Sequence, residues 1–208
     1  MNKLDYDIYI VKEKIRMEKG YLTRSERDKL KHMIDNPKSY ITTDDTIVAS
    51  KGKKIITNII ELRKPCREVT KDDDFKTVIS DLRDTLIANK RGLGLSANQI
   101  GYNLAISYIR ILDKVDETTK QLKYKEYVLI NPVMVEKQDK IVFHDEGCLS
   151  LPGVHVNTDR YVFVTITYLD EKLEKRMGIF ADLESIAVQH EIAHLNGRTI
   201  IDDKHRSV

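Results

Sequence analysis

Three residues near the end of the chain have the types and the spacing of a hydrolytic metal site. His190, Glu191 and His194 stand in the sequence HEIAH. On a helix, two histidines four residues apart project from the same face, so both imidazoles can bind one ion. Glu191 projects to one side, where it can take a proton from a metal-bound water acidified by the ion. The pattern predicts a metal-dependent hydrolase; the alternative is a chance placement of two partly exposed histidines.

The rest of the sequence limits where a third metal ligand can lie. A thermolysin-type zinc protease takes this ligand from a later glutamate, and no glutamate follows His194. A metzincin has a third histidine at the position that Ile200 occupies here. Both subclasses are therefore excluded. The third ligand is expected upstream, as a thiolate, an imidazole or a carboxylate in a segment that folds back onto the helix.

Of the two cysteines, Cys148 is the better candidate for this ligand. It lies in a turn-rich stretch, residues 146–153, where Gly147 lets the backbone come close to a ligand. A thiolate here completes a Cys-His-His set. Cys66 is instead expected to be a small buried hydrophobe. Two cysteines are too few for a disulfide scaffold.

Residues 91–101, RGLGLSANQIG, form a second unusual segment, with three glycines among small residues. The segment follows a predicted helix and lacks the glycine spacings of phosphate-binding loops. We therefore expect a strand and a turn in which the glycines let the backbone approach a substrate. Gln99 can then offer an amide N–H to a developing oxyanion.

The elements around these segments predict an α+β fold. Apolar residues at helical spacing indicate a helix over 75–86, behind the acidic residues 72–74. A last helix is expected over 182–196, with Asp182 as its N-cap and Gly197 just past its end. Between them, β-rich segments are expected at 104–111, 127–130, 141–143 and 162–168. We expect small, mostly antiparallel sheets packed around a central metal-binding helix.

The start of the chain reads as an addition to this fold. Its first 35 residues are charged and helical in pattern, with Thr23 and Glu26 in capping-box spacing and a stop at Asn36-Pro37. We predict an N-terminal helical extension of unknown role over 1–50 and a catalytic domain over 51–208.

Composition narrows the function classes further. The 35 basic residues nearly cancel the 33 acidic ones, which leaves no electrostatic case for binding nucleic acid. No apolar stretch approaches the roughly 18 residues of a membrane span, and no secretory signal is evident. We expect a cytoplasmic or organelle-internal protein without membrane association.

Three segments, residues 92–99, 146–150 and 189–194, together resemble the three signature motifs of the peptide deformylases. This family removes the formyl group from the N-terminal formylmethionine of new polypeptides. The resemblance covers roughly residues 55–203 and includes Leu129-Ile130-Asn131-Pro132. Because the three motifs occur in the expected order, they are more specific together than any one alone.

The resemblance implies a role for each site residue. Cys148, His190 and His194 would bind the metal, and Glu191 would act as general base and then as general acid while metal-bound water attacks the formyl carbon. The Gln99 side chain and the Leu149 backbone N–H would hold the oxyanion. The implied substrate-binding residues are Gly92, Leu93, Gly94, Leu95, Glu146, Gly147, Leu183, Ile186 and Ala187, of which Leu95 and the last three are plausible lining for a methionine pocket and alternatively plain core.

The resemblance also implies a cofactor and partners. One divalent ion is expected, with Fe²⁺ as the native metal and Zn²⁺, Ni²⁺ or Co²⁺ as substitutes. The substrate is an N-formylmethionyl peptide, and association with the ribosome is left open. A related metallohydrolase acting on another amide, or an inactive metal-binding homologue, are the alternatives. Intact Glu191 and Gln99 argue against the inactive homologue.

The chain departs from the family pattern in three places. Ala193 stands where an aspartate is usual, and such a carboxylate could pair with a basic residue such as Arg160. Ser96 stands where alanine is common. The sequence also lacks the C-terminal helix of many bacterial members, as in shorter viral-type members.

Overall fold

The structure, a computed structural model, describes residues 24–35, 52–89, 92–115 and 122–206. The chain divides into two compact units, one of Met1–Val48 with Ile111–Lys125 and one of Ala49–Arg110 with Glu126–Val208. In the first unit, α2 (Arg24–Asp35) lies within the stretch predicted to be helical, and the predicted stop at Asn36-Pro37 lies outside the described residues. Thr23, the expected cap, lies outside the described residues. The second unit holds every predicted site residue.

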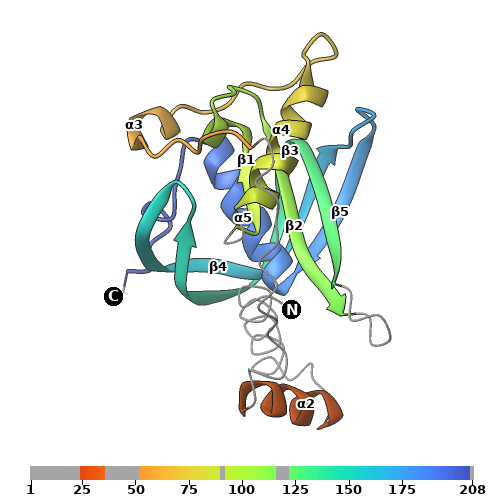
Figure 1. Cartoon of the computed structure of the whole chain (residues 1–208), viewed down its shortest axis with the longest axis vertical. Coiled ribbons are helices and arrows are strands. Elements are labelled where there is room, and N and C mark those ends of the chain that lie inside the picture. The colour runs from red at the N-terminus through yellow and green to blue at the C-terminus, as the bar shows by residue number, and fades with distance from the viewer. Residues whose placement is uncertain (1–23, 36–51, 90–91, 116–121, 207–208) are drawn as a thin grey trace. The chain divides into compact units, whose positions relative to one another are not determined.

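The strands form one five-stranded sheet in the order β1-β2-β3-β4-β5 (Figure 1). They are β1 (Gly94–Ser96), β2 (Ile106–Val115), β3 (Leu122–Cys148), β4 (Leu151–Leu169) and β5 (Lys175–Ala181). β1 pairs antiparallel with β2, and β4 pairs antiparallel with both β3 and β5. The α+β class is confirmed, although the strands expected as several small sheets belong, in the described residues, to a single larger one.

The two short segments expected at 127–130 and 141–143 are parts of the 27-residue strand β3. Its pairing with β4 is interrupted by register shifts, among them Phe143/Glu146 and Gly147/Cys148. Bulges bend a strand and break the alternation of inward and outward side chains. This is why the sequence pattern divided one strand into pieces. The bends also carry the end of β3 to the helix that holds the histidines.

Two 14-residue helices, α4 (Phe75–Ala88) and α5 (Asp182–Leu195), pack against strands of the sheet. Asp74 caps α4 by accepting a hydrogen bond from the Thr77 backbone N–H at 3.3 Å, within the acidic run expected there. Short α3 (Ile59–Leu62) and the 3-10 turn η2 (Ala97–Ile100) complete the described helices.

The expected N-cap of α5 is wrong. The cap is Ala181, the last residue of β5, and Asp182 is already the first helical residue, with φ at 52°. The chain passes from strand to helix with no loop, and the cap residue is an alanine, which has no polar side chain to cap the helix. The expected end is confirmed, because Gly197 has φ at 69°, in the left-handed region that favours glycine.

Helix α5 lies at the centre of the second unit, in contact with β1, β4, β5 and η2 (Figure 1). Val162, Val164 and Ile166 of β4 are buried at alternate positions, as their spacing predicted. No described helix is long and apolar enough to cross a membrane.

Candidate active site

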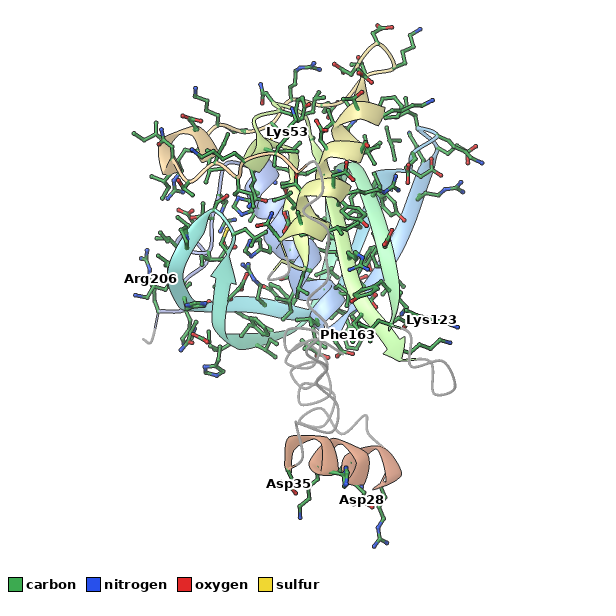
Figure 2. The ribbon with its side chains drawn as sticks, viewed as in Figure 1. Asp28, Asp35, Lys53, Lys123, Phe163 and Arg206 are labelled. Carbon is green, nitrogen blue, oxygen red and sulfur yellow. The ribbon has the colours of Figure 1, made fainter. Side chains whose placement is uncertain are left out.

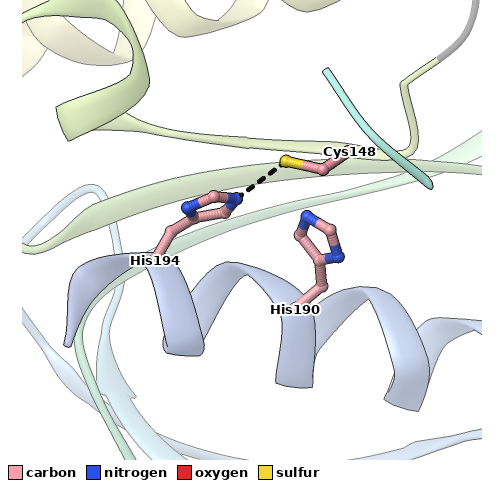
Figure 3. A group of neighbouring side chains, drawn as sticks. All are labelled: Cys148, His190 and His194. Carbon is pink, nitrogen blue, oxygen red and sulfur yellow. Dashed lines mark hydrogen bonds between the residues drawn. The ribbon is translucent and has the colours of Figure 1, made fainter. Parts of the chain in front are cut away.

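The predicted metal ligands meet in space. Atoms offered by Cys148, His190 and His194 all lie within 4.8 Å of one another. Figure 3 shows the two imidazoles rising from successive turns of α5 toward the cysteine at the end of β3, with Cys148 Sγ 3.2 Å from His194 Nε2. A tetrahedral ion with bonds of about 2.0–2.3 Å separates its ligand atoms by roughly 3.3–3.6 Å. The Cys148–His194 separation is close to this value, so the three side chains could together hold one such ion.

His190 is oriented by a carboxylate. Its Nδ1 lies 2.6 Å from Glu146 Oε1, which leaves Nε2 as the nitrogen for the metal. Carboxylates commonly hold ligand histidines in this way, fixing the ring and its tautomer. The structure thus places Glu146 behind a predicted metal ligand, a contact that the sequence did not predict.

Glu146 is itself held by Arg160 from β4. Arg160 Nε and Nη2 donate to the two oxygens of Glu146 at 2.9 and 2.8 Å, and the Thr158 hydroxyl also donates to it. Burial alone would raise the pKa of Glu146, but His190 and Arg160 lower it to about 2. The carboxylate therefore remains charged at neutral pH.

Glu191 lies on the same helix, almost fully buried, with 3% of its surface exposed. The Ser96 hydroxyl donates to Glu191 Oε2 at 2.6 Å. Burial raises the pKa of Glu191, while His190 and the Ser96 hydrogen bond moderate the rise. A carboxylate with a raised pKa is suited to take up and return a proton near neutral pH.

Gly94 and Gly92 are explained by close contacts within the protein. A Cβ on Gly94 would lie 2.5 Å from Glu191 Oε1, and one on Gly92 would lie 2.6 Å from Leu149 Cδ1. A side chain at either position would displace Glu191 or Leu149. The structure shows that the glycines make room for Glu191 and Leu149. Their expected approach to a substrate stays a prediction.

Gln99 is buried with its amide directed at the cysteine. Its Oε1 accepts a hydrogen bond from the Ser96 backbone N–H at 2.8 Å, so Nε2 points the other way. Nε2 lies 3.1 Å from Ser150 Oγ and 3.9 Å from Cys148 Sγ. A donor is therefore held beside the three predicted metal ligands.

Comparison with known proteins assigns the family. The family model described as polypeptide deformylase matches residues 53–207. The chain belongs to this family. Peptide deformylase from Elusimicrobium minutum is 39% identical over 148 residues, covering 65% of this chain and 80% of the relative. Peptide deformylase 2 from Vibrio cholerae is 37% identical, covering 68% and 79%.

Solved structures agree with the sequence relatives. A peptide deformylase from Legionella pneumophila is 33% identical with a TM-score of 0.62, over 74% of this chain and 86% of that one. A probable peptide deformylase from Synechococcus phage S-SSM7 is 26% identical with a TM-score of 0.63, over 73% and 99%. The family is metal-dependent and removes the N-formyl group from nascent peptides, so the chain is a hydrolase of this kind.

The remaining residues predicted to bind substrate lie on β1, β3 and α5 and in the segment just before β1. Leu93 and Leu95 belong to the segment around β1, the edge strand of the sheet, and the Leu93 carbonyl accepts from the Arg110 N–H at 2.8 Å. Gly147 pairs with His155 across β3 and β4. Leu183, Ile186 and Ala187 are buried on α5, and their place in a methionine pocket stays a prediction. Cys66 is half-buried and burial raises the pKa of its thiol to about 11, which matches an unreactive thiol.

Sequence reasoning missed three supporting residues. Ser96 was seen only as a small residue, although it contacts Glu191. Asn98 Nδ2 donates to the His194 carbonyl at 2.8 Å and so anchors the end of α5. Asp203 pairs with Arg160 at 2.6 Å. Ser96 and Asn98 lie inside a recognised motif, where a polar side chain among small residues was the available signal; Asp203 gave no such signal.

Proposed function

We propose that this chain removes the formyl group from N-terminal formylmethionine at the site formed by Cys148, His190 and His194. The observation that carries the proposal is the convergence of these three ligands beside the buried Glu191. The three side chains would hold one divalent ion. When bound, that ion acidifies a water molecule and polarises the formyl carbonyl.

Glu191 carries the proton in this proposal. Its Oε2 is engaged by Ser96, so Oε1 is the oxygen available for proton transfer. Oε1 takes a proton as water adds to the formyl carbon, and the protonated Glu191 then donates it to the departing nitrogen. The carbon–nitrogen bond breaks, and the products are formate and a free N-terminal amine.

Gln99 and Leu149 stabilise the charge that develops on the formyl oxygen. The Gln99 amide is held in one orientation by Ser96, so little reorganisation is needed when the charge appears. The Leu149 backbone N–H, one residue after Cys148, is the second donor. The peptide would pair in β fashion with the Gly92–Leu95 segment, since β1 is an edge strand. Leu95, Leu183, Ile186 and Ala187 would line the methionine pocket.

We propose Fe²⁺ as the native metal, with Zn²⁺, Ni²⁺ and Co²⁺ able to substitute. A soft thiolate beside two imidazoles accepts all of these ions. A ferrous site with a thiolate ligand is sensitive to oxygen, because Cys148 can be oxidised and lose its ligating form. The iron form should lose activity during aerobic purification; full activity after it would count against iron.

The experiment that tests the function is hydrolysis of a formyl-Met peptide by the anaerobically prepared iron or nickel protein, with formate release as the readout. Release of formate at a rate proportional to bound metal is expected. No turnover with metal bound would favour an inactive homologue, and cleavage of internal peptide bonds would favour a metallopeptidase. Actinonin, which is bound to the peptide deformylase of Synechococcus elongatus, is a useful probe, and it should compete with the peptide.

We further propose that the reaction takes place in the cytoplasm and that residues 1–50 form an extension separate from a catalytic domain over 51–208. The start of the family match at residue 53 supports this division. Limited proteolysis should release a fragment beginning near residue 50. Cosedimentation with ribosomes, with and without residues 1–50, tests whether the extension binds them.

A further inference from the structure

The chain after α5 runs back along β4 toward the residues behind the metal ligands. The Asp203 carbonyl accepts from the Asp159 N–H at 3.0 Å, and the His205 N–H donates to the Asn157 carbonyl at 2.7 Å. Figure 2 labels Arg206 at the described end of this segment, beside the bend of β3 and β4. We call residues 201–206 the tail. These contacts set the tail in register with the part of β4 that carries Arg160.

The tail brings Asp203 to the one edge of Arg160 that Glu146 does not occupy. Arg160 Nη1 pairs with Asp203 Oδ2 at 2.6 Å, while Nε and Nη2 pair with Glu146. The side chains of Arg160, Glu146 and Asp203 are 4%, 5% and 9% exposed. The other oxygen of Asp203 pairs with Arg198, which is 55% exposed. Arg160 thus forms buried ion pairs with two carboxylates.

These contacts form a continuous path to a metal ligand. Asp203 pairs with Arg160, and Arg160 donates hydrogen bonds to Glu146. Glu146 in turn contacts Nδ1 of His190. In a buried position each charge depends on its partner, and removal of one partner leaves the next uncompensated. Between Glu191 and its end at Leu195, α5 itself has no acidic residue that could serve Arg160.

We propose that Asp203 is a positioning residue for His190, which it acts on through Arg160 and Glu146, so that the tail is part of the metal site. Within α5, position 193 is an alanine and has no carboxylate to offer Arg160. The second carboxylate for Arg160 is instead that of Asp203, which lies beyond the end of the helix. The inference rests on the proposed metal site, and its test is metal affinity measured without substrate. Failure of deformylation would therefore leave it intact.

The test compares Asp203→Asn with Asp202→Asn by titrating the metal-free protein with Co²⁺ and following the absorption of the Co²⁺–thiolate site. Asp202 is a matched control in the same tail, because it pairs with the exposed Arg63 instead. Loss of residues that orient ligands costs roughly 10–100-fold in metal affinity, so Asp203→Asn should weaken Co²⁺ binding by about tenfold. Asp202→Asn should change it less than about twofold on the same scale.

A double-mutant cycle tests the path. If Asp203 acts through Glu146, Asp203→Asn should add little to the loss already caused by Glu146→Gln. Unchanged Co²⁺ affinity in Asp203→Asn, with only a lower unfolding temperature of the metal-free protein, would overturn the proposal. Equal losses in Asp202→Asn and Asp203→Asn would overturn it as well.

Arg160→Lys keeps the proposal testable if Asp203→Asn does not fold. Lysine keeps the positive charge but not the planar fork that contacts two carboxylates at once. This variant should lose Co²⁺ affinity at least as strongly as expected for Asp203→Asn. Wild-type affinity in Arg160→Lys would refute the path through Arg160.

Discussion

Helices α4 and α5 have the same length of 14 residues but opposite surroundings. Helix α4 buries one stripe, and its other face is at least partly open to solvent. Helix α5 is buried on nearly every side, polar residues included. The buried residues of α4 are Phe75, Val78, Ile79, Leu82, Thr85 and Leu86; those of α5 are Leu183, Ser185, Ile186, Ala187, Val188, Gln189, Glu191, Ile192, Ala193, His194 and Leu195.

The difference shows that polar side chains on a buried helix need hydrogen-bond partners within the protein. Polar groups on the open face of α4 can bind water, but those on α5 need partners in the protein. Ser185 donates to the Tyr161 carbonyl at 2.8 Å, Gln189 donates to the same carbonyl, and Glu191 accepts from Ser96. Changes on α4 should therefore lower stability, whereas changes on α5 and its partners should lower metal binding or turnover.

The largest effect on the α5 side is expected from Glu191→Gln. The amide has nearly the same shape but cannot accept the proton, so kcat should fall by about 10²–10⁴-fold. Metal content, measured by atomic absorption, should stay at the wild-type level. Cys148→Ala is the contrasting variant, because it removes a ligand and should lose the metal itself. Equal metal loss in both variants would mean that Glu191 is a ligand.

On the α4 side, Leu82→Ala should lower the free energy of unfolding by about 2–5 kcal/mol, because Leu82 is fully buried and truncation leaves a cavity. Chemical denaturation measures this loss. Turnover per folded molecule should remain close to wild type. A drop in kcat larger than the drop in folded fraction would show that α4 also affects turnover, and would contradict the predicted difference between the two helices.

Acid should lower the free energy of unfolding by protonating Glu146, which contacts His190 of α5. Its pKa is about 2 in the folded protein and ordinarily 4.5, so its charge stabilises the fold above about pH 4.5. That contribution, on the order of 3 kcal/mol, is lost as pH falls from about 5 toward 2. Urea denaturation of the metal-free protein at pH 7 and pH 3 should show a smaller pH dependence in Glu146→Gln than in wild type. The same dependence in both would contradict this assignment.

The smallest effect is expected from Ser96→Ala. Loss of one hydrogen bond to a carboxylate costs about 1.5 kcal/mol or more, which corresponds to roughly tenfold in kcat if the hydroxyl orients Glu191. KM and metal content should not change. Ser107→Ala is the matched control, since the Ser107 hydroxyl lies 2.8 Å from that of Ser96 and no hydrogen bond from Ser107 to Glu191 is seen in the described residues. Equal losses in the two variants would argue against a direct role for Ser96.

Much of the site could be predicted from local sequence because its parts are local. The spacing of His190 and His194 places both on one helix face in any α-helix, and the stripe of α4 likewise depends only on helical periodicity. The three motifs together also predicted Cys148 as the third ligand, and the structure brings it to the two histidines. Two local predictions failed where tertiary connections intervened: Asp182 is inside its helix, and the bulged β3 was divided into short strands.

By itself, the sequence determined the residue types of the site, the helix that carries two of its ligands and the family to which the chain belongs. Only the tertiary structure decided which residues stand behind those ligands. Glu146 and His190 are 44 residues apart in the chain, and Arg160 and Asp203 are 43 apart. Such contacts depend on the bulges of β3 and on the return of the tail along β4, because strand register and chain reversal place these side chains together and local periodicity does not.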